Sequence, residues 1–134
     1  GAVDRSTWQQ LINVSDESRQ KMFDNVKREF IQENGISNGD TTKRSQIFRE
    51  YQLSVKKEDR AKGTWTLQQY EDKYRSAMYA AVKAANPKWE PGQPFDPSIL
   101  DSVTRETVES TLVKSGNTLV KRSSISGSSL DVQI

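Results

Sequence analysis

Two apolar stripes with the same helical spacing constrain the fold of this chain more than any other feature of its sequence. Both stripes have offsets of 0, +1, +4 and +8, and they consist of Met22, Phe23, Val26 and Phe30, and of Ile47, Phe48, Tyr51 and Val55. Side chains at such offsets share one face of an α-helix. Two helices with matching stripes and a short connection are expected to pack as an antiparallel pair.

Local signals set the limits of these two helices. Ser15 is a suitable N-cap for the first helix, and Gly35 can adopt the left-handed conformation that ends it. The turn signal Asn38-Gly39-Asp40 follows. The sequence therefore predicts helices over residues 16–34 and 42–55.

A third helix is predicted over residues 67–86 from a signature at its start. Thr66 and Gln69 match a capping box, and Trp65 and Tyr70 match the hydrophobic staple that often accompanies one. The charged run 56–63, which ends in glycine, is expected to be a loop. Pro87 closes the helix, because the residue before a proline disfavours the helical region.

The remaining elements are less sharply defined. A short helix is predicted over residues 6–14, and a proline-rich connector follows Pro87. A last helix is predicted over residues 97–114, with Pro97 at its first position. A small β-hairpin near residues 110–122, turning at Gly116-Asn117, is the alternative, because threonine and valine favour strands. The helix is the preferred interpretation.

These patterns predict an all-α fold, a small bundle of four to five helices with a proline-rich connector. The helical domain is expected to span residues 1–115, and a serine-rich extension to span residues 116–134. Only 33% of the 134 residues are hydrophobic. Because such a core is thin, a chain of this kind often gains stability from copies of itself or from a partner.

The composition argues against common enzyme chemistry. Neither histidine nor cysteine occurs in the sequence, so the commonest general base, the thiol nucleophile and the usual zinc ligands are missing. No glycine-rich phosphate-binding motif is found. We therefore expect neither an enzyme nor a cofactor-binding protein. No apolar run is long enough to cross a membrane, and a soluble protein, intracellular or virion-associated, is expected.

A local surplus of basic residues suggests nucleic-acid binding as one alternative. The net charge of the chain is only +2, but residues 36–63 carry seven basic residues against four acids. The basic residues are Lys43, Arg44, Arg49, Lys56, Lys57, Arg60 and Lys62. A basic loop beside a helix can straddle phosphates. Charges that only solvate a helical surface explain the same pattern.

The leading hypothesis is a non-enzymatic structural or assembly protein that associates with itself or docks to a larger complex. Small viral and phage virion components have a similar build, which is an analogy of architecture alone. The residues predicted to contact a partner lie in the connector and the tail: Trp89, Phe95, Lys121, Arg122 and Ile134. For Trp89 and Phe95, packing of the connector onto the helices is the competing interpretation.

Overall fold

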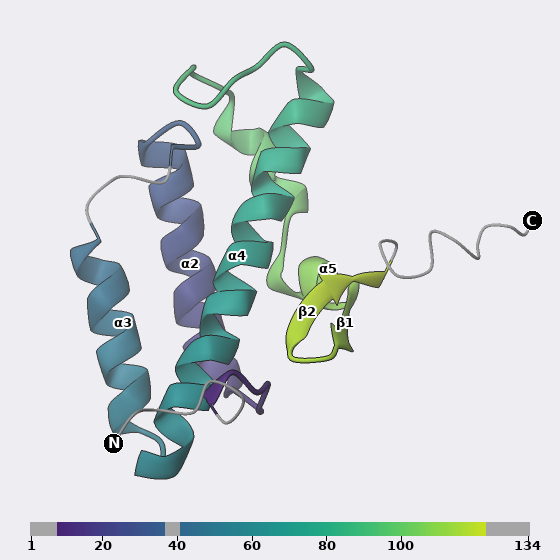
Figure 1. The fold of residues 1–134 in the computed structure, drawn as a ribbon. Coiled ribbons are helices and arrows are strands. Elements are labelled where there is room, and N and C mark those ends of the chain that lie inside the picture. Colours follow the sequence, from purple (N-terminus) through teal and green to yellow (C-terminus); the bar gives the residue numbers. More distant parts are fainter. Residues whose placement is uncertain (1–7, 37–40, 123–134) are drawn as a thin grey trace, which may run out of the picture.

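The computed structural model describes residues 8–36 and 41–122 of the chain. The fold is mostly helical, with a small two-stranded antiparallel hairpin near the C-terminus (Figure 1). The long helices are α2 (Asp16–Gln32), α3 (Thr42–Leu53) and α4 (Arg60–Ala85), and the one-turn 3₁₀ helix η1 (Lys57–Asp59) precedes α4. The chain then returns along α4 as the 3₁₀ helix η2 (Pro97–Ser102), α5 (Arg105–Glu109), β1 (Leu112–Ser115) and β2 (Thr118–Lys121).

The predicted pairing of the first two stripes is confirmed, and α4 completes the core. The hydroxyl oxygen of Ser15 accepts a hydrogen bond from the amide of Ser18 (3.2 Å) at the start of α2. After α2, Gly35 adopts a φ of 85°, and its amide donates to the carbonyl of Phe30 (2.9 Å). α2 and α3 run antiparallel (Figure 1), and α2 packs most extensively against α4.

The predicted start of the third helix is wrong, because α4 begins at Arg60 rather than at residue 67. The run 56–63 is therefore not a loop, and Gly63 lies buried inside the helix. A Cβ atom at Gly63 would lie 1.3 Å from the hydroxyl oxygen of Tyr51 on α3. Only glycine allows this close approach, although its helix propensity is about 1 kcal/mol less favourable than that of alanine.

Thr66 and Trp65 consequently make different contacts from those predicted. The hydroxyl group of Thr66 donates to the carbonyl of Lys62 (2.9 Å) and accepts from the amide of Ile12 (3.0 Å). The ring of Trp65 lies edge-on to that of Trp8, with 6.1 Å between centroids. Neither residue caps a helix.

The helix predicted over residues 6–14 is also wrong within the described residues, because residues 9–15 are not helical. The backbone of this segment is bonded instead to α4, through the contact between Ile12 and Thr66.

The preferred helix over residues 97–114 is wrong, and the alternative hairpin is correct. The chain is extended at Val103 (φ −94°, ψ 105°), and a capping box formed by Thr104 and Thr107 then starts the short helix α5. The hairpin pairs Leu112 with Lys121 and Ser115 with Thr118. The boundary predicted between residues 115 and 116 falls at its turn, and the strand after the turn packs on the body through the buried Leu119.

The proline-rich connector is pinned to the helices by its aromatic residues, as one of the two interpretations predicts. Trp89 is only 1% exposed. Its ring lies 6.2, 5.5 and 5.8 Å from the rings of Phe30, Tyr79 and Phe95, between centroids. The prediction that Trp89 contacts a partner is therefore wrong, because the body of the protein already covers the ring. Phe95 is half-buried against Phe30.

Candidate functional site

The seven basic residues predicted to bind nucleic acid do not form one patch. Lys43 and Arg44 lie at the start of α3, whereas Lys56 and Lys57 follow its end. A helix of this length separates them by about 18 Å. The charges that are adjacent in sequence are therefore divided between two regions of the surface.

Arg44 is held by the body of the protein. Its guanidinium group donates to both carboxylate oxygens of Glu71 on α4, at 2.7 and 3.0 Å. The Glu71 side chain is only 5% exposed. The same guanidinium group lies 4.7 Å from the ring centroid of Phe48. Arg44 therefore fixes α3 on α4 and has little capacity left for a phosphate.

Arg60 has a comparable structural role at the other end of α3. Its Nε atom donates to the backbone carbonyl of Gln52 (2.9 Å), one of the last carbonyl groups of α3. The side chain therefore helps to fix the turn between α3 and α4.

We use the term basic corner for the remaining side chains around this turn, which are Arg49, Leu53, Lys56, Lys57 and Lys62. Within the described part of the chain, none of its four cations forms an ion pair. Leu53 is 73% exposed, and it lies on the same face of α3 as Arg49, four residues earlier. The acids Glu58 and Asp59 moderate the positive charge but do not cancel it.

The opposite end of α4 has the opposite charge. Residues 86–102 contain three acids and one lysine, and we call the acids Glu90, Asp96 and Asp101 the acidic end. α4 has 26 residues and separates this end from the basic corner by about 39 Å. Figure 1 shows the connector after α4 and the turn before it at opposite ends of the molecule.

The acids of this end differ in their partners. Glu90 forms an ion pair with Lys83 (3.0 Å). A hydrogen bond from the Ser98 backbone lowers the pKa of Asp96 and keeps it charged. Asp101 is exposed and has no ion-pair partner among the described residues.

Exposed apolar side chains accompany the acidic end as well. Ile36 is 39% exposed and Tyr79 is 36% exposed. Ile36 lies over the connector, since a Cβ atom added at Gly92 would be 3.3 Å from its Cδ1 atom. Both ends of the molecule therefore combine charge with apolar surface.

The other residues predicted to contact a partner lie at the C-terminal side. Lys121 is exposed on β2, and the amide of Arg122 donates to the carbonyl of Thr111 (2.6 Å). Ile134 lies outside the described residues.

The densest polar cluster was not predicted from the sequence, because its members are far apart along the chain. Tyr74 donates to the carboxylate of Glu109, which also accepts hydrogen bonds from Arg19 and Arg105. Arg105 further donates to Gln20 (3.0 Å). These bonds join α2, α4 and α5. Since each charge in the cluster has an opposite partner, we assign it a structural role.

The sequence matches a protein family described as "Domain of unknown function (DUF3879)" over residues 1–134. The chain belongs to this family. No curated protein matches the chain, and no solved structure does.

The DUF3879 description names no activity. No group of three or more potential metal ligands of the His, Cys, Asp and Glu types occurs within residues 8–36 and 41–122. In the same two ranges, no helix is both long and apolar enough to cross a membrane.

Proposed function

We propose that this chain is a non-enzymatic assembly protein whose copies associate head to tail, with the basic corner of one copy against the acidic end of the next. The observation that carries the proposal is the opposite charge of the two ends of α4, about 39 Å apart. Opposite potentials steer two surfaces together and fix their orientation.

Apolar surface at each end gives the contact a second component. Leu53 projects from the basic corner, and Ile36 and Tyr79 are partly exposed at the acidic end. Two basic corners would repel each other, which disfavours a symmetric dimer through that surface. A head-to-tail contact is heterologous and produces rings or open filaments.

Nucleic-acid binding through residues 43–62 is the competing proposal. Arg44 and Arg60 are engaged within the body, and Lys43 lies away from the corner. An exposed leucine is also more useful against an apolar protein surface than against phosphates. These observations favour a protein partner.

A charge-exchange experiment tests the assembly proposal. In sedimentation velocity at low salt, the full chain is expected to show a mass above that of a monomer, increasing with concentration and decreasing with salt. Two double variants should each weaken association by about tenfold or more. The first is Lys56→Glu with Lys57→Glu, and the second is Glu90→Lys with Asp101→Lys. Mixing the two variants should restore association, because opposite charges then face each other again.

The control is Lys114→Glu, a charge reversal on the hairpin at a residue that belongs to neither end. It should leave association unchanged. A strictly monomeric wild-type chain at every concentration would overturn the proposal. A monomer that binds duplex or single-stranded DNA at low salt, and loses binding in the Lys56→Glu and Lys57→Glu variant, would establish the competing one.

A further inference from the structure

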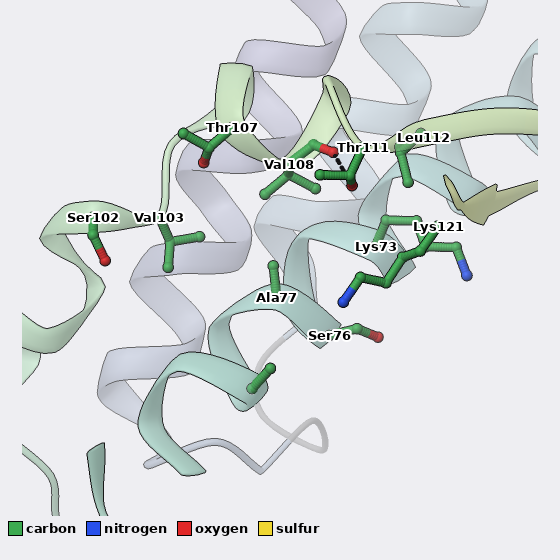
Figure 2. Close-up of a pocket in the computed structure, with 11 residues that line it drawn as sticks. Lys73, Ser76, Ala77, Ser102, Val103, Thr107, Val108, Thr111, Leu112 and Lys121 are labelled. Atoms are coloured by element: carbon green, nitrogen blue, oxygen red, sulfur yellow. Dashed lines mark hydrogen bonds between the residues drawn. The ribbon is translucent and has the colours of Figure 1, made fainter. Parts of the chain in front are cut away.

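A pocket of about 200 Å³ lies between α4 and the segment that returns along it (Figure 2). Its apolar wall consists of small or branched side chains, with Ala77 and Ala80 from α4 and Val103 and Val108 from the facing segment. Because alanine leaves space where longer side chains would fill it, the two layers do not close on each other here. The pocket is remote from the basic corner.

The polar groups of this pocket are cationic or neutral. Lys73 on α4 and Lys121 on β2 both line it, and no aspartate or glutamate does (Figure 2). Lys121 has no ion-pair partner within the described residues. Lys73 lies 3.6 Å from the exposed carboxylate of Asp72, its neighbour in sequence. The pocket therefore has a net positive lining.

The hydroxyl groups of the pocket divide into used and available donors. Thr107 and Thr111 already donate to the carbonyls of Thr104 (2.9 Å) and Val108 (2.7 Å). The hydroxyl groups of Ser76 and Ser102 have no hydrogen-bond partner among the described residues, so each can donate to a ligand oxygen.

We propose that this pocket binds a small organic carboxylate with an apolar body. An apolar cavity of about 150 Å³ can hold benzene, so a pocket of about 200 Å³ accommodates a ring or short alkyl chain together with a carboxylate. The apolar body lies against Val103 and Val108. The carboxylate accepts hydrogen bonds from the ammonium groups of Lys73 and Lys121, on the side of the pocket where Ser76 also lies (Figure 2). This proposal does not depend on the assembly function.

Benzoate and hexanoate are suitable probes, with benzamide and 1-hexanol as neutral analogues of similar size. In amide NMR titrations of the full chain, both carboxylates should shift residues of α4, α5 and β2 around the pocket. The neutral analogues should bind at least about tenfold more weakly, because they lack the charge that the lysines complement.

Two variants with a matched control separate binding at the pocket from non-specific effects. Lys121→Met removes the charge and keeps much of the apolar stem, and it should weaken carboxylate binding by about tenfold. Ala77→Leu should abolish binding by filling the pocket. Lys114→Met removes an exposed lysine of the same hairpin that does not line the pocket, and it should change nothing.

Several results would overturn the proposal. These are the absence of saturable shifts with either carboxylate, equal binding of the neutral analogues, or unchanged binding in Lys121→Met. If Ala77→Leu disturbs the fold, the Lys121→Met and Lys114→Met pair still decides the question.

Discussion

Tyr51 and Tyr74 are both buried in the helical body, but their hydroxyl groups are in opposite situations. The hydroxyl of Tyr74 donates to Glu109. The hydroxyl of Tyr51 is buried, has no hydrogen-bond partner among the described residues, and fills the space left by Gly63. An unmade hydrogen bond in the interior costs free energy, whereas a bond to a carboxylate stabilises the fold.

The two tyrosines should therefore respond differently to the same substitution. Tyr74→Phe is expected to lower the free energy of unfolding by about 1.5–3 kcal/mol, since it removes a hydrogen bond to a charged group. Tyr51→Phe is expected to be neutral or slightly stabilising, within about 1 kcal/mol, because no bond is lost. Urea unfolding followed by circular dichroism measures both. Equal losses in the two variants would contradict this account.

The ionisation of Tyr74 should make the free energy of unfolding depend on pH in the alkaline range. Burial, together with the hydrogen bond to Glu109, raises the pKa of Tyr74 above its ordinary value. Below the unfolded-state pKa, about 10, the tyrosine is protonated in both states and its full contribution is present. Above it, the unfolded state loses the proton while the folded state keeps it, so the free energy of unfolding falls as pH rises.

In the Tyr74→Phe variant, the free energy of unfolding should fall less steeply at alkaline pH, by up to about 1.4 kcal/mol per pH unit. Urea midpoints measured on both proteins at pH values from about 9 to about 11 test the difference. Tyr79→Phe, at a partly exposed ring, is the matched control. Parallel curves for wild type and Tyr74→Phe would show that the buried tyrosine does not titrate as proposed.

At the scale of elements, the contact between α3 and α4 determines where α4 begins. Gly63 lacks a Cβ atom, so the Tyr51 ring of α3 lies directly against the backbone of α4. Arg60 and Arg44 attach the two ends of α3 to neighbouring structure. A charged run with a glycine therefore becomes the 3₁₀ helix η1 and the first turn of α4.

Gly63→Ala tests this dependence, because the expected change in the free energy of unfolding has the opposite sign to the change that helix propensity predicts. In a helix without tertiary contacts, the substitution would stabilise by about 0.5–1 kcal/mol. Here the methyl group collides with Tyr51, so the free energy of unfolding should fall by about 1–3 kcal/mol.

Hydrogen exchange at residues 57–66 should also accelerate in Gly63→Ala as α3 and α4 separate. Tyr51→Leu shortens the opposing side chain, so adding it to Gly63→Ala should restore part of the lost free energy of unfolding. A double-mutant cycle should then show a favourable coupling between the two sites. A stabilised Gly63→Ala variant would contradict the observed packing.

At the scale of the whole molecule, Glu109 connects the C-terminal segment to the helical body. Its carboxylate receives hydrogen bonds from Tyr74 on α4, Arg19 on α2 and Arg105 on α5. The side chains of both arginines and of Glu109 are mostly buried. Removal of the carboxylate would leave two neighbouring arginines without their common partner.

Glu109→Ala should therefore lower the free energy of unfolding by about 2–3 kcal/mol. Glu106→Ala, on the same short helix but exposed, should cost less than about 0.5 kcal/mol. Urea unfolding compares the two variants. Hydrogen exchange should show the hairpin amides opening earlier in Glu109→Ala. Equal effects of the two substitutions would contradict the role assigned to this cluster.

The sequence alone determined the helical class of the protein and the pairing of α2 with α3. The matched stripes, Ser15 and Gly35 are local signals, and their physical effect depends on neighbours within one or two turns. Both interpretations of residues 110–122 were also available from the sequence, since threonine and valine favour strands whereas the apolar spacing suits a helix.

Only the tertiary structure decided the start of α4, the choice of the hairpin and the burial of Trp89. Each depends on a partner distant in sequence, namely Tyr51 for Gly63, α4 for the hairpin, and Phe30 for Trp89. The same holds for the function-bearing surfaces. The seven basic residues between positions 43 and 62 divide into two structural arginines, four cations at the basic corner, and Lys43 at the far end of α3. The length of α3 and the position of the Glu71 carboxylate beside Arg44 cause this division, and the second depends on how α3 packs against α4, which cannot be read from the sequence.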